Sequence, residues 1–202
     1  MSALVRTRAA IPEDAEAIAS LFDAAASPCF CRYWHFEGTK NAWLERCAFA
    51  AETNREEFVA RARVSSPEAS GVIAIADDGS IVGWMKLAPR DSLPKLRSLP
   101  VYRSLDLGPG ANVLAIGCFL VHPAHRRTGV ARELVAGAVR IARTAGCTLE
   151  TYPRHVSERI HDEEAWMGPL TVFREAGFTV HAGEQPYAVW RLETPVDEQS
   201  DF

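Results

Sequence analysis

A short basic segment between an apolar run and a helical pattern carries the clearest chemistry in this sequence. Arg126 and Arg127 are followed by Thr128, Gly129 and a helix-forming stretch that begins at Val130. The first N–H groups of a helix have no partner within the helix, and the helix dipole places partial positive charge at the same end. Gly129 has no side chain to hinder a ligand, and the arginines add counter-charge. The segment therefore predicts a phosphate-binding site.

Two common phosphate-binding motifs are absent from this segment. A Walker loop needs Gly-x-x-x-x-Gly-Lys-Ser/Thr and a dinucleotide fingerprint needs Gly-x-Gly-x-x-Gly, and residues 121–134 contain neither. Considered alone, Arg126 and Arg127 would be two solvated arginines at a turn. The strand before them, together with the glycine and helix after them, favours the phosphate site.

Cysteine and aromatic residues gather nearer the N-terminus. Cys29, Cys31, His35 and Cys47 could ligate zinc, but these gaps depart from the usual spacing of structural zinc sites, so we expect no metal. Five cysteines, an odd number, also argue against a disulfide scaffold. The aromatic residues either cover a substrate cleft or fill the core beneath a long connection; they are Phe30, Tyr33, Trp34, Phe36 and Trp43.

The first half of the chain predicts a strand, three helices and a hairpin. Residues 4–8 predict the strand, and Pro12 with the acids after it predicts a helix that ends near Ala26. Two further helical patterns span residues 41–51 and 55–63. The hairpin is predicted by the apolar runs 71–76 and 81–87, which an Asp-Gly turn separates.

The basic segment lies inside a predicted strand–helix–strand unit. Residues 113–121 predict the first strand, and residues 130–145 predict a helix that ends at Gly146. Residues 147–152 predict the second strand, which should lie parallel to the first because a helical crossover joins them.

The remaining segments complete an α/β order in one domain over residues 1–202, with residues 194–202 as a flexible tail. Residues 89–110, rich in proline and glycine, predict a long excursion that lines a site. A helix is predicted over residues 163–176, and strands over 178–180 and 187–192.

Composition excludes several classes of protein. No apolar run approaches the roughly 20 residues that span a bilayer, and the N-terminus lacks the pattern of a secretory signal, so we expect a cytoplasmic protein without a membrane partner. A formal net charge of -4 provides no global basic field for nucleic acid, and we expect no nucleic-acid partner.

The segment Arg126-Arg-Thr-Gly129-Val-Ala131, with Val-His-Pro before it, resembles the Arg/Gln-x-x-Gly-x-Gly/Ala signature of the GNAT superfamily of acetyltransferases. Val82-Gly-Trp84 in the hairpin and Phe173-Arg-Glu-Ala-Gly-Phe178 near the C-terminus extend this resemblance. A narrower resemblance, to a bacterial subgroup, rests on four short motifs: Cys29-Phe-Cys-Arg-Tyr-Trp34, Val-Gly-Trp followed by Pro89-Arg90, Gly117-Cys-Phe119 and Glu150-Thr-Tyr-Pro153.

The resemblance implies the GNAT acyl-CoA N-acyltransferase fold, in which helices flank a central mixed sheet with splayed parallel strands. It also implies that acetyl-coenzyme A lies between strands 113–121 and 147–152, with a backbone amide near Phe119 or Leu120 polarising the thioester carbonyl. The implied cofactor-binding residues are Phe119, Leu120, Val121, Arg126, Arg127, Thr128, Gly129, Val130 and Ala131.

Direct transfer to an amine requires a base, because an alkylamine with a pKa of about 10.4 is mostly protonated at neutral pH. Glu150 is the candidate, since desolvation on an interior strand would raise its pKa toward a useful value. Its alternative role is a solvent-facing or structurally paired acid, and His122 and His125 are alternative bases. Cys118 lies in an apolar run and predicts inert packing, so direct attack is favoured over an acyl-cysteine intermediate.

One departure from the superfamily pattern keeps a second function open. Many members have a tyrosine where this chain has Phe173, and the tyrosine hydroxyl can protonate the departing thiolate. The alternative is therefore a catalytically degenerate module that binds coenzyme A or senses it. The acceptor, a small-molecule or peptide amine, is not identified by any motif, and the exposed edge of the last strands could pair two copies as a homodimer.

Overall fold

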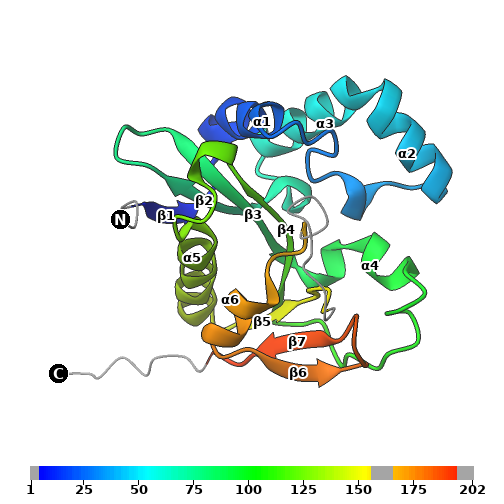
Figure 1. Ribbon diagram of the computed structural model, residues 1–202. Helices are drawn as coiled ribbons and strands as arrows, with labels where there is room; N and C mark the ends of the chain where they lie inside the picture. The colour runs from blue at the N-terminus through cyan, green and yellow to red at the C-terminus, as the bar shows by residue number, and fades with distance from the viewer. Residues whose placement is uncertain (1–4, 156–165, 195–202) are drawn as a thin grey trace.

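The computed structural model describes residues 5–155 and 166–194, and these form one seven-stranded sheet of order β1-β2-β3-β4-β5-β7-β6 (Figure 1). Strands β4 and β5 are parallel, and every other neighbouring pair is antiparallel. The strands are β1 Arg6–Ala9, β2 Gly71–Ile75, β3 Ile81–Pro89, β4 Val113–Val121, β5 Thr148–Thr151, β6 Thr179–Ala182 and β7 Val189–Leu192.

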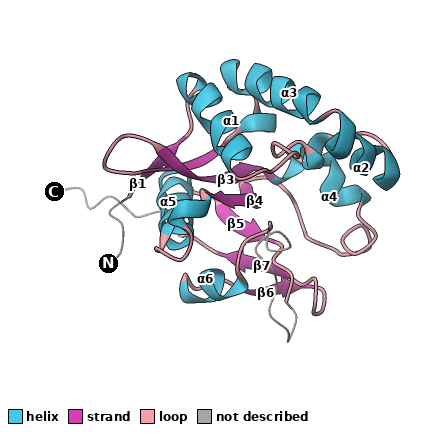
Figure 2. Cartoon of the chain, turned by 45° about the horizontal axis from the view of Figure 1, so that its top comes forward, coloured by secondary structure: helices cyan, strands magenta, loops and turns pink. Residues whose placement is uncertain are grey.

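Helices cover both faces of this sheet (Figure 2). Helix α5 packs on one face against β1, β2 and β3, and α1 packs on the other face against β3. The α-helices are α1 Ala15–Ala24, α2 Lys40–Phe49, α3 Ala51–Arg63, α4 Pro94–Ser98, α5 Val130–Ala145 and α6 Leu170–Glu175. Short 3₁₀ turns are η1 Pro12–Asp14, η2 Tyr33–His35, η3 Pro67–Ala69, η4 Arg90–Ser92 and η5 Pro123–His125.

The alternation of side chains along β3 separates two hydrophobic cores. Trp84 lies in the core beneath α1 and α3, whereas its neighbour Met85 lies in the core beneath α5 and α6. Successive side chains of a strand point to opposite faces of its sheet, so an apolar run such as β3 can fill both cores. Both side chains are completely buried.

Glycine residues fix where α5 begins, where it ends and how closely it approaches the sheet. Gly129 (φ 98°) precedes its first turn, and Gly146 (φ 62°) closes it in the left-handed conformation that favours glycine. A Cβ atom on Gly83 of β3 would lie 2.7 Å from Val130 Cγ1. The start of α5 can therefore sit directly on β3.

The parallel strands β4 and β5 pair only at one end. Their register runs from Val113 opposite Thr148 to Ile116 opposite Thr151. Further along β4, the Phe119 amide donates instead to the carbonyl of Trp166, at 2.7 Å. The splayed parallel strands expected from the sequence are thus present, with residues 166–169 lying beside the open half of β4.

Most elements predicted from the sequence are confirmed. The hairpin, the strand over 113–121 and the helix over 130–145 have the predicted bounds within two residues. The start of the helix predicted over 163–176 is wrong. Residues 166–169 are not helical, since Gly168 has φ 88° and α6 begins only after Pro169. Residues 163–165 of that prediction lie outside the described residues. The excursion over 89–110 contains η4 and α4, which the sequence analysis did not predict.

Two further expectations concern surfaces. Strand β6 lies at an edge of the sheet and Val180 on it is 51% exposed, so the pairing of two copies along this edge stays a prediction. Within residues 5–155 and 166–194, no helix combines the length and the apolar character that crossing a membrane requires.

Candidate functional site

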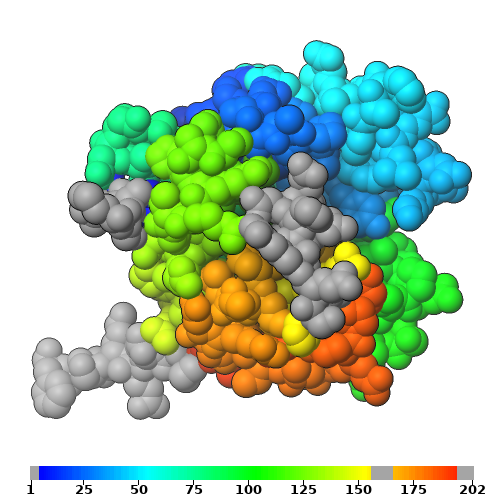
Figure 3. Space-filling view, viewed as in Figure 1, coloured from blue at the N-terminus to red at the C-terminus, as the bar shows by residue number. Residues whose placement is uncertain are grey.

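A pocket of about 680 Å³ lies between the open half of β4, the start of α5 and helix α6. Figure 3 shows the start of α5 and the α6 region next to each other on one face of the molecule. The lining residues come from four segments: Phe119, Leu120 and Val121; His125, Arg126, Arg127, Gly129, Val130, Ala131 and Arg132; Arg154 and His155; Gly168, Pro169, Leu170, Thr171, Val172 and Arg174.

The turn before α5 has the backbone geometry of an anion site. Arg127 (φ 63°) and Gly129 (φ 98°) both adopt left-handed conformations. The Gly129 carbonyl accepts hydrogen bonds from the amides of Arg132 and Glu133, at 2.9 and 3.2 Å. These are the first backbone hydrogen bonds of α5. Helix geometry leaves the amides before Arg132 without an acceptor inside the helix, and the helix dipole adds positive potential there. The predicted phosphate loop therefore lies at one end of a real pocket.

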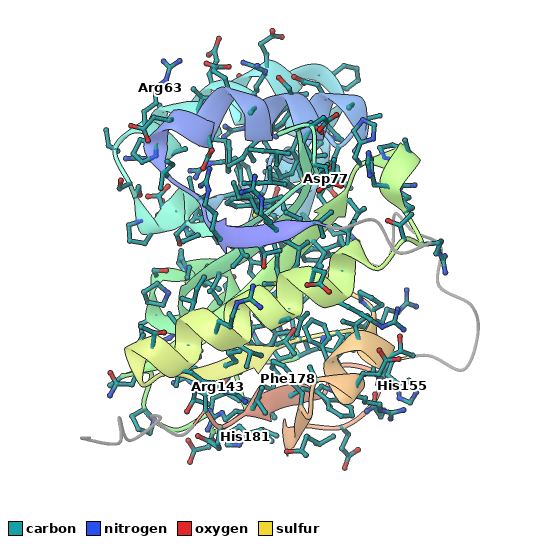
Figure 4. All side chains as sticks on the ribbon, turned by 90° about the vertical axis from the view of Figure 1, so that its left-hand side faces the viewer. Arg63, Asp77, Arg143, His155, Phe178 and His181 are labelled. Atoms are coloured by element: carbon teal, nitrogen blue, oxygen red, sulfur yellow. The ribbon has the colours of Figure 1, made fainter. Side chains whose placement is uncertain are left out.

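Arginine is the main charged residue in the described lining of the pocket. Five arginines line it, and no aspartate or glutamate is among the described lining residues. Arg132 forms an ion pair with Glu175 at 2.6 Å, so part of its charge is compensated from outside the pocket. Figure 4 shows His155 beside α6 and Arg143 at the C-terminal end of α5. This charge distribution suits a ligand with several phosphate groups.

Of the two amides predicted to polarise a thioester carbonyl, those of Phe119 and Leu120, the Phe119 amide already has an acceptor. It donates to the Trp166 carbonyl at 2.7 Å, in a geometry typical of a strand-to-strand hydrogen bond. The Trp166 ring packs against Trp34, with centroids 5.6 Å apart, and against Tyr33 at 5.7 Å. Residues before α6 thus connect the pocket to the aromatic segment near the N-terminus.

The structure brings together the cofactor-binding residues predicted from the sequence. All nine except Thr128 line the pocket. The Thr128 hydroxyl instead donates to the His125 carbonyl at 2.7 Å and holds the turn in shape. Sequence reasoning missed the second wall, which includes Arg154, Arg174 and residues 168–172. The only sequence signal for that wall was the motif around Phe173. The segments of the wall are distant from β4 along the chain and lie beside it only in the folded structure.

Glu150, the predicted base, lies away from this pocket in a buried network. It is completely buried, and its Oε2 contacts Arg191 Nη2 at 2.7 Å and Arg90 Nη1 at 3.2 Å. Its Oε1 accepts a hydrogen bond from the Tyr152 hydroxyl, with the two oxygens 2.5 Å apart. Both carboxylate oxygens are therefore engaged. In the sequence, Arg90 belongs to the Pro89-Arg90 motif, and no local pattern indicates Arg191.

Two aromatic residues near the expected chemistry are buried. Phe173 stands at the superfamily tyrosine position and packs against Phe119 and Phe178, with centroids 5.6 and 5.3 Å apart. Burial raises the pKa of Tyr152 well above its ordinary value, and the neighbouring Glu150 raises it further. The Tyr152 hydroxyl thus stays protonated at neutral pH and donates its hydrogen bond to Glu150.

The histidines and cysteines singled out from the sequence occupy different places. His125 lines the pocket, whereas His122 caps η5 by accepting the Ala124 amide at 3.2 Å. Cys31 and Cys118 are buried together in the core beneath α1 and α3. No three His, Cys, Asp or Glu residues come together as a metal site within the described ranges.

The aromatic segment is mostly core. Trp34 and Phe30 are buried, and Trp43 packs against Tyr33 and Phe36, with centroids 5.5 and 5.1 Å apart. The interpretation of these rings as core filling is confirmed for Phe30, Trp34 and Trp43.

Comparison with known proteins was consistent with this geometry. A sequence profile of the acetyltransferase (GNAT) family matches residues 21–161. No curated protein matched the chain. The narrower bacterial subgroup stays a prediction.

Several solved structures share the fold. A GCN5-related N-acetyltransferase from Kribbella flavida has 19% identity and a TM-score of 0.54, covering 94% of this chain and 97% of that one. The protein yncA from Salmonella typhimurium, solved with acetyl-CoA, has 17% identity and a TM-score of 0.51, with 97% and 96% covered. The PaiA N-acetyltransferase from Thermoplasma acidophilum, solved with coenzyme A, has 12% identity and a TM-score of 0.52, with 94% and 99% covered.

Proposed function

Because the chain belongs to the acetyltransferase (GNAT) family, we propose that it transfers an acetyl group from acetyl-coenzyme A to an amine by direct attack. The observation that carries the proposal is the cationic pocket at the start of α5, lined by arginines and by no described acidic residue. Acetyl-CoA carries a pyrophosphate and a further phosphate, and the solved relatives from Salmonella typhimurium and Thermoplasma acidophilum contain acetyl-CoA and coenzyme A.

In this proposal the donor binds along β4. Its pyrophosphate contacts the amides that precede Arg132 at the start of α5, and Arg126 and Arg127 supply counter-charge. The pantetheine arm runs beside Phe119 and Val121, where β4 has separated from β5. Donor binding on the Phe119 amide requires the Trp166 carbonyl to move away from it.

Acetyl transfer forms a C–N bond, breaks the C–S bond of the thioester and removes a proton from the amine. The neutral amine nitrogen attacks the thioester carbonyl carbon, the Phe119 amide stabilises the oxyanion, and the C–S bond then breaks to release coenzyme A as thiolate. A thiol pKa near 8.5 makes this leaving group tolerable without full protonation. The amine proton passes to the Tyr152 oxygen as the Tyr152 hydroxyl proton passes to Glu150 Oε1, so the acceptor amine has to reach Tyr152, outside the pocket between β4, α5 and α6. No covalent enzyme intermediate forms.

A second candidate is a module that binds acetyl-CoA without turnover. It is favoured by Phe173, which offers no hydroxyl to the thiolate, and by the engagement of both Glu150 oxygens. Acceptor-dependent thioester cleavage, measured as release of free coenzyme A thiol with a panel of amines, would exclude it.

The first test is calorimetric titration of acetyl-CoA into the protein. We expect micromolar binding by the wild type, and a loss of at least about tenfold in the Gly129→Glu variant, because the new carboxylate would repel the pyrophosphate. Because Gly129 has φ 98°, that variant is also strained, so Ala131→Glu in the first turn of α5 serves as a second acidic variant with helical backbone.

The matched control is Arg143→Ala, which removes an arginine from the opposite end of the same helix. We expect its affinity for acetyl-CoA to equal that of the wild type. A wild type that fails to bind acetyl-CoA would overturn the proposal, as would an equal loss in the Arg143 variant.

A further inference from the structure

The aromatic rings around η2 are not all buried. Trp34 is completely buried, whereas Tyr33 and Phe36 are half-buried and Trp166 is 37% exposed. Helix α4 packs against η2, and Figure 1 shows α4 beneath the segment that leads into α2. This contact brings Lys95 of α4 to the rings. We name the side chains of Tyr33, Phe36, Lys95 and Trp166 the Tyr33–Trp166 face.

The Tyr33–Trp166 face lies next to the atoms that acetyl transfer would use. The Trp166 carbonyl accepts a hydrogen bond from the Phe119 amide at 2.7 Å, and this amide is the proposed partner of the thioester carbonyl. The Trp34 ring packs against both Trp166 and Tyr152, the proposed proton carrier, with centroids 5.6 and 6.3 Å apart. An acceptor amine that reaches the thioester and the Tyr152 hydroxyl therefore approaches along these rings.

The rings of this face suit an aromatic ligand. Trp166 and Tyr33 pack edge to face, with centroids 5.7 Å apart and an angle of 82° between the rings. Because Trp166 is 37% exposed, part of its ring remains available to a further ring. Burial raises the pKa of Tyr33, so its hydroxyl stays protonated and adds no charge to the face.

Lys95 supplies the charge of this face. Its half-buried Nζ lies 5.5 Å from the Tyr33 centroid and 5.7 Å from the Phe36 centroid. It donates to the carbonyls of Phe36 and Gly38, at 3.4 and 3.1 Å. An ammonium group has three N–H donors, and these neutral carbonyls accept two of them. Within residues 5–155 and 166–194 no carboxylate forms an ion pair with Lys95, so its charge can attract an anion.

This distribution of charge disfavours polycationic amines. A second ammonium group on the ligand would meet the Lys95 charge, and like charges placed together are destabilising. The carboxylates near this face in the sequence are engaged or lie elsewhere. Asp91 pairs with Arg97 at 2.6 Å, and Glu37 lines a different cavity together with Arg46.

We propose that the acceptor is an aromatic amine that carries an acidic group at the end of its ring remote from the amine. The ring stacks on Trp166 and the acid pairs with Lys95. The two groups are far apart in the ligand because the rings of Tyr33 and Trp166 lie between Lys95 and the Phe119 amide. This inference rests on the proposed acetyl transfer and specifies its acceptor.

The reaction is the one proposed above. The amine nitrogen forms a bond to the acetyl carbon as the C–S bond breaks, coenzyme A leaves as the thiolate, and the amine proton passes to the Tyr152 oxygen.

The test compares four amines as acceptors. They are 4-(2-aminoethyl)benzoate, 2-phenylethylamine, which lacks the acid, 6-aminohexanoate, which lacks the ring, and spermidine, a polycation. Release of coenzyme A thiol from acetyl-CoA gives kcat and KM for each amine. We expect kcat/KM for 4-(2-aminoethyl)benzoate to exceed that of each other amine by at least about tenfold. Calorimetric titration of the same amines into the protein saturated with coenzyme A should give the same order of affinity without turnover.

Lys95→Gln tests the acid-binding role, because it removes the charge and keeps an N–H donor. We expect KM for 4-(2-aminoethyl)benzoate to rise at least about tenfold with kcat unchanged, and KM for 2-phenylethylamine to stay as in the wild type. The matched control is Arg97→Gln on the same helix, since Arg97 is exposed and already paired with Asp91. It should leave both KM values unchanged.

Two outcomes would overturn this acceptor and leave acetyl transfer in place. One is that spermidine or 6-aminohexanoate is a better acceptor than 4-(2-aminoethyl)benzoate. The other is that Lys95→Gln raises KM for both aromatic amines equally, or for neither. A wild type that fails to bind acetyl-CoA would overturn acetyl transfer itself, and this acceptor with it.

Discussion

At the scale of single residues, the sequence predicts a catalytic role for Glu150, whereas the structure gives it a structural role. The sequence offers a carboxylate on an interior strand, which predicts a base. The structure surrounds it with Arg90, Arg191 and the Tyr152 hydroxyl. A buried carboxylate with this set of donors also holds three segments together, namely η4, β5 and β7, so its removal should affect folding as well as catalysis.

We expect Glu150→Gln to lower the free energy of unfolding by about 3–5 kcal/mol, because two buried or half-buried arginines would lose their countercharge. Urea unfolding followed by circular dichroism measures this. The matched control is Glu175→Gln, whose ion pair with Arg132 is exposed and screened by solvent, so the free energy of unfolding should stay close to that of the wild type.

Two results separate the roles of Glu150. A variant as stable as the wild type would show that the ion pairs contribute nothing to folding. A variant that is destabilised, binds acetyl-CoA and still cleaves the thioester at the wild-type rate would remove the base from the proposed mechanism, because a general base contributes at least about 10²-fold.

At the scale of elements, the contact between β3 and α5 positions the pocket between β4, α5 and α6. Val130, the first residue of α5, lines the pocket and lies against Gly83 of β3. A Cβ at Gly83 would also lie 3.1 Å from Ala74 Cβ and 3.2 Å from Leu134 Cδ1. The sheet cannot accept a side chain there unless the start of α5 moves outward.

Gly83→Ala should therefore weaken acetyl-CoA binding by about tenfold, as well as destabilise the fold, because it displaces the amides to which we assign the pyrophosphate. Titration calorimetry on folded protein measures the change. Gly146→Ala provides the comparison at the other end of α5. It should cost about 1 kcal/mol of stability through its left-handed conformation and leave the affinity unchanged. Equal affinities of both variants would contradict this account.

The elements also show how far sequence patterns reach. Helix α5 and strand β4 follow from periodicity and glycine placement, which act over neighbouring residues. The start of α6 was harder to predict. The helical pattern of apolar residues continues across Gly168 and Pro169, but these two residues end the helix there. The partners of Glu150 come from residues 60 and 41 positions away, and no local pattern encodes such pairings. The left-handed turn and helix start at residues 126–131 could be predicted because the pattern is contained in six consecutive residues.

At the scale of the whole molecule, one sheet separates two cores. Phe58 of α3 lies in the core with Trp84, and Phe173 of α6 lies in the core with Met85. Both phenylalanines are completely buried. Because the same strands supply both cores, loss of packing on one face should weaken the other.

We expect Phe58→Ala and Phe173→Ala each to lower the free energy of unfolding by about 3–5 kcal/mol. In both variants, tryptophan fluorescence and circular dichroism should report one coincident transition. Phe49→Ala, at a residue 86% exposed, should change little. Two separate transitions in either variant would show that the cores unfold independently.

The hydrogen bond between the Phe119 amide and the Trp166 carbonyl would make the proposed affinity for acetyl-CoA depend on a conformational equilibrium. If acetyl-CoA uses this amide, it binds only the fraction of molecules in which the bond is open, and the apparent Kd is the intrinsic Kd divided by that fraction. A substitution that strengthens the packing of the Trp166 ring on Trp34 and Tyr33 would then lower the affinity for acetyl-CoA without touching the ligand. Packing of the aromatic segment would thereby set the concentration of acetyl-CoA to which the protein responds.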